Sequence, residues 1–112
     1  DFNLHRKEFD QTISYSNKMI LRLVKMKFKP EEAANFIAFF DTIKDEIAAM
    51  PGILNVKLYQ DDMDENTFFT HSTWLNVSSL EAYKRSELFG RVWPATKKLF
   101  AEDAMAWSLK LK

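Results

Sequence analysis

The sequence stretch that decides the fold is residues 19–28, which read MILRLVKMKF. Its β-branched and aromatic content, followed by a stop at Lys29 and Pro30, predicts a β-strand. Alternate side chains of a strand point to opposite faces. Both faces are apolar in this strand: Leu21 and Leu23 lie on one, and the other carries Ile20, Val24, Met26 and Phe28. A strand with one wet face would alternate cleanly, so we expect both faces to be covered.

The residues that follow this strand predict a helix and a hairpin. Pro30 suits the first turn of a helix, and apolar side chains then recur every three or four residues until Pro51 and Gly52 end the pattern. This buried stripe comprises Ala33, Phe36, Ile37, Phe40, Ile43 and Ile47. Segments 53–59 and 67–75 read as two strands joined by a polar connection, which predicts a hairpin.

The last third of the chain predicts more helix and a final strand. Ser78 and Glu81 have the spacing of a capping box at a helix start. Gly90 and Pro94 interrupt the helical pattern, so residues 79–100 predict one kinked helix or two pieces. Residues 105–111 alternate between apolar and other side chains, as in a half-buried strand.

The order of these elements predicts an α+β fold, a ferredoxin-like β-α-β-β-α-β sandwich with helices on one face of an antiparallel sheet. With 112 residues, the chain has room for one core. We expect one domain at residues 19–112 and an N-terminal appendage at residues 1–18. The second apolar face of the first strand needs another chain to cover it, which predicts a homodimer.

The amino-acid composition limits the classes of binding partner that are expected. Sixteen basic and sixteen acidic side chains balance to zero, so no overall field attracts a polyanion and nucleic acid is not expected as a partner. Lys25, Lys27 and Lys29 alternate along one strand, but the RNA-recognition pattern of glycine and paired aromatics is missing, and edge protection explains them better. The sequence has no cysteine and no apolar run of about 20 residues. We therefore expect a cytoplasmic protein without a membrane partner.

The connection between the two hairpin strands contains an acidic cluster, which is a candidate calcium site. The cluster lacks the glycine and the terminal glutamate of an EF-hand loop, so a solvated turn is the preferred interpretation and no metal site is predicted. Its members are Asp61, Asp62, Asp64 and Glu65.

From residue 19 onward the chain resembles the antibiotic biosynthesis monooxygenase family. The resemblance is carried by the opening strand, by MPGILNVKLYQD at residues 50–61, and by THSTWLNVSSLEAYKRSELFGRVWPATKKLF at residues 70–100. It implies a dimeric α/β-barrel, in which two sheets face each other and each subunit has a pocket between sheet and helices. The characterised enzymes oxidise phenolic, quinol or anthrone-like rings with molecular oxygen and without metal or flavin. The protein binds the ring, promotes its deprotonation and excludes water.

The chain departs from the family at several pocket positions. Many quinol-oxidising members carry a histidine where Tyr83 stands, and often a second one where Leu88 stands. The haem-degrading branch uses an Asn, a Trp and a His at the positions of Val24, Tyr83 and Trp93. These replacements predict that the protein does not degrade haem. They also place Val24, Tyr83 and Trp93 at the substrate. The resemblance to the cofactor-free enzymes implies that the protein needs no cofactor.

Two polar side chains are candidates for catalysis. His71 stands among aromatic residues on the third strand, where a neutral imidazole would accept a phenolic proton; alternatively it is hydrogen-bonded at a sheet face. Arg22 lies mid-strand on the face of Val24, where it would stabilise a ring anion. Alternatively, Arg22 pairs with a helix carboxylate such as Glu87 or Asp41, since an unpaired buried charge is costly.

Four aromatic residues would form a wall for a flat ring, and their alternative role is plain core packing. They are Trp74, Tyr83, Phe89 and Trp93. The hydroxyl of Tyr83 would donate to a substrate oxygen or relay its proton. Two functions stay open from the sequence: a cofactor-free monooxygenase acting on a small aromatic or quinol-type molecule with oxygen, and a non-catalytic ligand-binding or structural dimer of the same fold.

Overall fold

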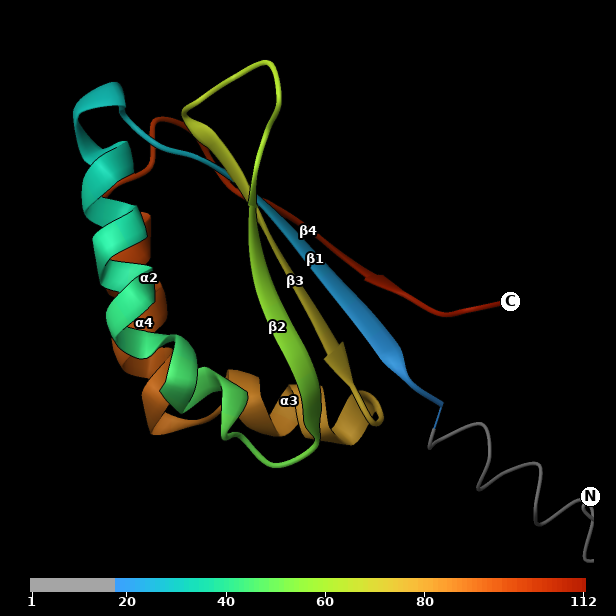
Figure 1. The fold of residues 1–112 in the computed structure, drawn as a ribbon. Helices are drawn as coiled ribbons and strands as arrows, with labels where there is room; N and C mark the ends of the chain where they lie inside the picture. Colours follow the sequence, from blue (N-terminus) through green and yellow to red (C-terminus); the bar gives the residue numbers. More distant parts are fainter. Residues whose placement is uncertain (1–17) are drawn as a thin grey trace, which may run out of the picture.

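The computed structural model describes residues 18–112, so the expected appendage at residues 1–18 lies outside the described residues except for Lys18. The described part forms one four-stranded sheet with helices packed on one side of it (Figure 1). In chain order the elements are β1 (Ile20–Lys27), the short 3-10 helix η1 (Pro30–Glu32), α2 (Ala33–Ala48), β2 (Ile53–Gln60), β3 (Thr67–Trp74), α3 (Val77–Lys84), α4 (Glu87–Lys97) and β4 (Met105–Leu109).

The sheet has the strand order β2-β3-β1-β4, and every neighbouring pair is antiparallel. The first strand therefore lies inside the sheet, between the third and the last strand. This is the ferredoxin-like α+β architecture predicted from the element order. Among residues 18–112, no helix is long and apolar enough to cross a membrane.

The second helical region is divided in two, but at a different place from the one predicted. The break falls at Arg85 and Ser86, whereas Gly90 and Pro94 both lie inside α4. The Ser86 side chain accepts a hydrogen bond from the backbone N–H of Phe89 and so caps α4. Because a capping hydroxyl satisfies a free N–H of the first turn, it starts a new helix after a tight turn.

The predicted cap of α3 is wrong by two residues. Asn76, in an extended conformation, accepts from the backbone N–H of Ser79 at 2.8 Å through its Oδ1 atom. Ser78 thus lies inside the first turn, and Glu81 pairs with Lys84 at 2.9 Å instead of reaching back. The helix start is held against the α2–β2 turn, where Gly52 has a φ of 84°. A Cβ atom on Gly52 would clash with the Ser79 side chain, so the close approach requires glycine.

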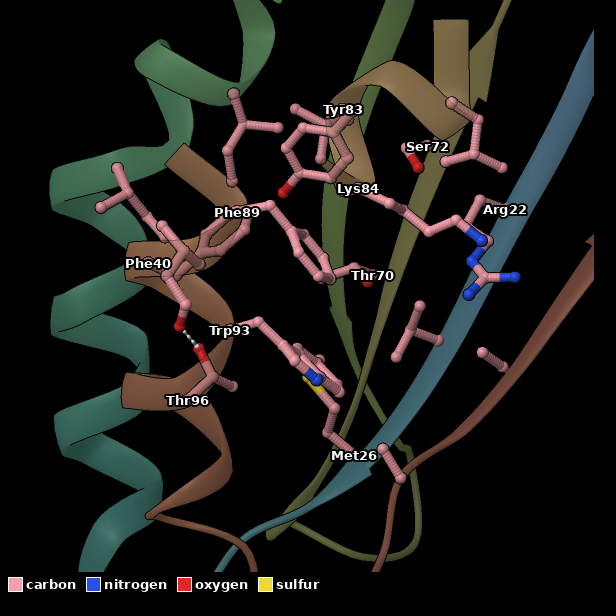
Figure 2. A pocket seen from close by; sticks show the side chains of 18 of the residues that line it. Arg22, Met26, Phe40, Thr70, Ser72, Tyr83, Lys84, Phe89, Trp93 and Thr96 are labelled. Atoms are coloured by element: carbon pink, nitrogen blue, oxygen red, sulfur yellow. Dashed lines mark hydrogen bonds between the residues drawn. The ribbon is translucent and has the colours of Figure 1, made fainter. Parts of the chain in front are cut away.

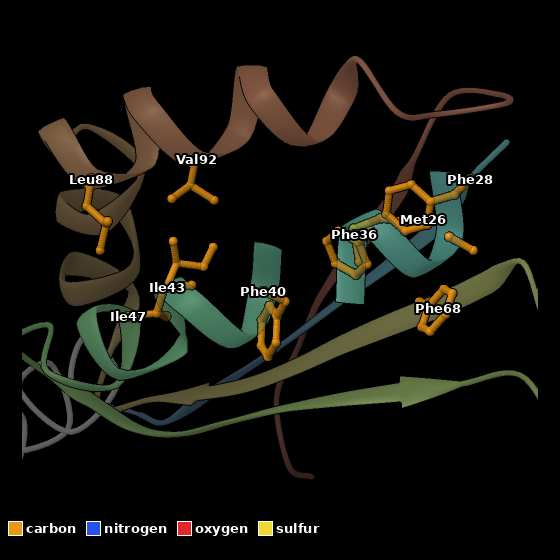
Figure 3. Packing of buried hydrophobic residues seen from close by; sticks show 10 residues of the cluster. Met26, Phe28, Phe36, Phe40, Ile43, Ile47, Phe68, Leu88 and Val92 are labelled. Atoms are coloured by element: carbon orange, nitrogen blue, oxygen red, sulfur yellow. The ribbon is translucent and has the colours of Figure 1, made fainter. Parts of the chain in front are cut away.

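The hydrophobic core lies between the sheet and α2 and α4 (Figure 3). Phe28 is fully buried; its ring stacks on Phe36 with centroids 4.2 Å apart and meets Phe68 edge-on at 5.8 Å. A second buried cluster joins Ile20, Trp74 and Leu80 at the α3 end of the sheet. The aromatic packing holds one end of α2 tightly against β1 and β3.

The opposite face of the sheet, the outer face, has no helix on it among residues 18–112 (Figure 1). Its side chains are mostly apolar, and β4 is exposed throughout; Trp107 keeps 38% of its surface exposed and Leu109 43%. The strand registers place seven apolar or aromatic side chains on this face, Leu21, Leu23, Tyr59, Phe69, Met105, Trp107 and Leu109. The polar side chains on the same face are Lys25, Asn55, Lys57, His71 and Thr73. The two-sided apolar pattern predicted for the first strand is therefore present.

The acidic connection between β2 and β3 forms a turn. The Asp61 carboxylate accepts from the backbone N–H groups of Met63 and Asp64, both at 2.9 Å. Asp64 in turn accepts from Thr67 and pairs with Lys27 at 3.4 Å. These local bonds lower the pKa of Asp64, with the backbone bond from Asn66 contributing most. Among residues 18–112, no three His, Cys, Asp or Glu side chains come together as a metal site.

Candidate functional site

A cavity of about 240 Å³ lies between the helix-facing side of the sheet and the helices α2, α3 and α4 (Figure 2). Ligand pockets usually measure roughly 300–1,000 Å³, so this one suits a small molecule. Most of the lining is apolar, and α2 contributes Phe36, Phe40, Ile43 and Ile47. The cavity occupies the position that sequence reasoning assigned to a substrate.

The sheet supplies the polar groups of the cavity. Arg22 on β1 lies between Ser108 of β4 and Ser72 of β3, and its Nη1 atom donates to the Ser108 hydroxyl at 2.9 Å. One row further along the sheet, Val24 lies beside Thr70. Arg22, Val24, Thr70 and Ser72 all line the cavity. The floor is therefore polar around Arg22 and apolar further along β1.

Arg22 has no ion-pair partner among residues 18–112. The alternative pairing with Glu87 or Asp41 does not occur, because Asp41 is bonded to Lys44 at 2.9 Å and no bridge from Glu87 is present in that range. A guanidinium has five donors, and within residues 18–112 the hydrogen bond of Arg22 is the one to Ser108. A half-buried cation with spare donors facing an apolar cavity is suited to binding an anion.

The four expected aromatic residues form a continuous row along the cavity. Figure 2 shows three of them, Tyr83, Phe89 and Trp93. Trp74 stacks on Tyr83 at 5.1 Å, Tyr83 meets Phe89 edge-on at 5.2 Å, and Phe89 stacks on Trp93 at 5.8 Å. Trp74 is fully buried, but the other three are only partly buried and keep surface toward the cavity. The row is both a part of the core and an aromatic wall for a flat ligand.

Tyr83 is the residue of this wall that carries a hydroxyl group, and Figure 2 shows that hydroxyl on the helix side of the cavity. Burial raises the pKa of Tyr83 to about 12. Because the neutral phenol is favoured, Tyr83 is protonated at neutral pH and is able to donate a hydrogen bond. Tyr83 is not suited to act as a general base there.

His71 does not line the cavity, and the expectation that it borders the same site as Arg22 is wrong. The register places it opposite Leu23 and Lys57, on the outer face, while its neighbours Thr70 and Ser72 face the cavity. β3 continues straight through this point, so strand alternation turns the imidazole away. Its ring meets Tyr59 edge-on at 6.1 Å, and its buried Nδ1 atom has no hydrogen-bond partner among the described residues.

Sequence reasoning missed four polar residues of this region. Thr70 and Ser72 share the parity of Trp74 on β3, and that parity was a usable signal. Ser72 also accepts a hydrogen bond from the indole N–H of Trp74 at 3.0 Å. Ser108 and Lys84 carried no such signal, because only the pairing of β4 with β1 and the placement of α3 bring them to Arg22.

Comparison with known proteins assigns a family. The family model described as antibiotic biosynthesis monooxygenase matches residues 19–93. The chain belongs to this family. Among curated proteins, the uncharacterized protein sll1783 of Synechocystis sp. is 25% identical over 79 residues, which are 70% of this chain. The chain spans about half the length of that relative, 54%.

Solved structures share the fold of this family member. A conserved protein from Methanosarcina mazei Go1 superposes with a TM-score of 0.81 at 19% identity, covering 89% of this chain and 99% of the other. A crystal structure described as an antibiotic biosynthesis monooxygenase gives 0.77 at 17% identity, with coverage of 83% and 98%. Rv0793 from Mycobacterium tuberculosis gives 0.78 at 13% identity, with coverage of 85% and 96%. At these identities the likeness concerns the fold.

Proposed function

We propose that this protein is a monooxygenase that oxidises a small aromatic or quinol-type substrate with molecular oxygen, without a metal or flavin. The observation that carries the proposal is Arg22, an unpaired cation among the described residues, facing a cavity walled by aromatic rings. Membership of the monooxygenase family supports the same reaction class.

In this mechanism the ring lies against the aromatic wall, and its oxygen points to Arg22. The guanidinium favours the anionic form of a phenol or enol, so it lowers the pKa of the bound substrate. The electron-rich anion then reacts with oxygen. For an anthrone-type ring, a CH₂ group becomes C=O: one oxygen atom enters the product, and the other leaves as water with the two hydrogens of the CH₂ group. No external reductant is needed.

The proton of the substrate is handled without a histidine. The cavity lining, among residues 18–112, contains no His, Asp or Glu, and Tyr83 stays protonated. Substrate deprotonation therefore relies on the charge of Arg22 and on transfer to water at the cavity mouth. Tyr83 donates a hydrogen bond to the ring oxygen or to the reduced oxygen species, while the apolar walls exclude bulk water.

An oxygen electrode tests this proposal. Purified protein is mixed with a panel of anthrones and quinols, and oxygen uptake is compared with the uncatalysed autoxidation of each compound. With the anthrones, stoichiometric conversion of CH₂ to C=O should accompany uptake. With the quinols, the product should be a hydroxyquinone, in which one ring C–H has become C–OH and the two quinol hydroxyl hydrogens have left in water. In both cases one labelled oxygen atom from ¹⁸O₂ should enter the product. Absence of any enhancement across the panel would overturn the proposal.

The second candidate is a non-catalytic ligand-binding or structural dimer, favoured by the position of His71. The imidazole within the described domain points away from the cavity, so the side chain best suited to proton abstraction does not reach a bound ring. Tight binding of an aromatic ligand without oxygen uptake would support this candidate over the enzyme.

We also propose that a second copy of the chain covers the outer face. The support is a broad apolar surface, with Met105, Trp107 and Leu109 each more than a third exposed on β4. Contiguous apolar patches of this kind are uncommon on monomers. Sedimentation at micromolar concentration should show a dimer, and a stable, well-folded monomer would contradict it.

A further inference from the structure

The charged residues of the cavity are both cations. Arg22 enters from β1 and Lys84 from α3, and Figure 2 shows both side chains directed to the same end of the cavity. Among the described residues that line the cavity, none carries a carboxylate. Two positive charges at one end of an otherwise apolar space create a potential that favours a fixed negative charge on the ligand.

Lys84 retains donors for such a ligand. Its ammonium pairs with Glu81 at 2.9 Å on the same helix, one turn away. An ammonium has three donors, so this pair leaves two of them. The Lys84 side chain is 33% exposed, which places it where the cavity meets solvent. Glu81 itself is outside the cavity lining.

The two cations form one electrostatic unit around this mouth. The pKa of the Glu81 carboxyl is lowered, chiefly by the hydrogen bond from Lys84, with smaller contributions from the positive charges of Arg85 and Arg22. Arg22 is fixed from the other side by its bond to Ser108 at 2.9 Å. Arg22 is thus held by the sheet and Lys84 by a helix, and their donors face the same space.

We propose that the substrate of this site is an aromatic hydroxy acid, with a carboxylate adjacent to the ring oxygen, and that Lys84 and Arg22 together bind this acidic end. The inference rests on the cavity being the substrate site proposed above. The carboxylate lies at the mouth between Lys84 and Arg22, and the ring oxygen lies on the inner side of Arg22. The apolar end of the ring then extends along Phe89 and Trp93.

The size of the cavity restricts the ring system. A space of about 240 Å³ is below the usual range for drug-sized ligands, roughly 300–1,000 Å³. An acid of one to three rings therefore fits better than a larger polycyclic molecule. A neutral two-ring compound of the same shape would leave both cations without a partner and would bind more weakly.

A matched pair of ligands tests the proposal by binding alone. Titration calorimetry without oxygen compares 1-hydroxy-2-naphthoate with its neutral isostere 1-hydroxy-2-naphthamide. Hydrogen bonds to charged groups contribute enough that the acid should bind about 10- to 100-fold more tightly. The preference should also shrink as salt is added, because the site opens to solvent. Equal affinity for the acid and the amide would overturn the proposal.

The variant Lys84→Met keeps the apolar stem of the side chain and removes its charge. The preference for the acid should fall about tenfold, while the affinity for the amide stays close to wild type. Lys44→Met is the matched control, because Lys44 pairs with Asp41 at 2.9 Å, also three residues apart on a helix, and does not line this cavity. An unchanged acid preference in a folded Lys84→Met protein would overturn the role of Lys84.

These binding results are independent of turnover. A strong preference for the acid without oxygen uptake would support the proposed acid-binding site and refute the proposed monooxygenase activity. Oxygen uptake with neutral rings, together with no preference for the acid, would support the monooxygenase activity and refute the acid-binding site. Thermal melts of Lys84→Met and Lys44→Met establish that each variant is folded before its affinities are compared.

Discussion

The two faces of the sheet carry side chains of similar hydrophobicity but differ in what covers them. On the helix-facing side, Met26, Phe28 and Phe68 are buried by α2 and α4, and a cavity remains near Arg22. On the outer face, Trp107 and Leu109 stay exposed. The helix-facing side combines a closed core with a largely apolar cavity around Arg22. The outer face exposes the apolar side chains of β4 and also carries Lys25, Asn55, Lys57, His71 and Thr73.

This difference shows that hydrophobic pattern and chemical role are separate properties of a strand. β1 supplies Arg22 to the cavity and Leu23, the next residue, to the outer face. A substitution at Arg22 should therefore affect ligand binding, whereas a substitution at Leu23, one position further along the strand, should affect subunit assembly. Substitutions at neighbouring or matched residues should in this way affect the two faces separately.

The largest effect is expected from Leu23→Glu, in the middle of the outer face. Desolvating the carboxylate under a partner subunit costs several kcal/mol by order of magnitude, so the dimer should dissociate or the protein should aggregate. Sedimentation velocity measures this outcome. Val77→Glu is the control, since Val77 is 43% exposed at the start of α3 and does not belong to the sheet. An intact Leu23→Glu dimer would refute the proposed interface.

On the other face, Arg22→Ala should reduce oxygen uptake with an anthrone or quinol by about 10²-fold, because removal of an anion-stabilising group typically costs 10²–10³-fold. Arg91→Ala is the matched control: Arg91 pairs with Glu46 at 3.1 Å and does not line the cavity. Steady-state kinetics of both variants, with light scattering to verify assembly, decide the outcome. Equal rates in the two variants would exclude Arg22 from the mechanism.

Tyr83 should make the free energy of unfolding depend on pH in the alkaline range. Burial raises its pKa from 10.0 to about 12, so above pH 10 the unfolded chain loses this proton before the folded chain does. The free energy of unfolding should therefore fall by about 2 kcal/mol at most as the pH rises from about 10 to about 12. Denaturant unfolding should show this fall in the wild type and a smaller fall in Tyr83→Phe.

The control for Tyr83 is Tyr59→Phe on the outer face, where the side chain is 49% exposed. Its pH profile of unfolding should follow the wild-type profile. If Tyr83→Phe and the wild type lose the same stability over this range, Tyr83 is not the group that links the cavity to pH.

The smallest effect is expected from His71→Gln. Because the imidazole faces away from the cavity, oxygen uptake should stay within about twofold of wild type, since the side chain makes no contact with a transition state bound there. Assays at several protein concentrations separate an effect on assembly from an effect on chemistry. A loss of about 10²-fold in a dimeric His71→Gln protein, the size expected of a general base, would show that His71 reaches the substrate.

The sequence alone determined the element order and most of the aromatic wall. The alternation of residues 19–28 and the three- and four-residue spacing after Pro30 are local periodicities, and local periodicity specifies which face of an element is buried. For the same reason, the parity of Arg22 with Val24 and of Ser72 with Trp74 was available from the sequence. The positions of Tyr83, Phe89 and Trp93 followed from helical spacing together with the family resemblance.

The tertiary structure decided which of these faces meet around one cavity. The break between α3 and α4 lies at Ser86 because the Ser86 side chain caps the start of α4. Gly90 and Pro94 are the stronger helix-breaking signals in the sequence, and hydrophobic periodicity does not show which of the three positions ends a helix. The path of β3, straight past Thr70 and Ser72, places His71 on the outer face. The pairing of β4 with β1 brings Ser108 to Arg22, and the placement of α3 brings Lys84 to the same cavity. Local periodicity specifies only which face of each element is buried, so it does not specify these contacts between residues distant in sequence.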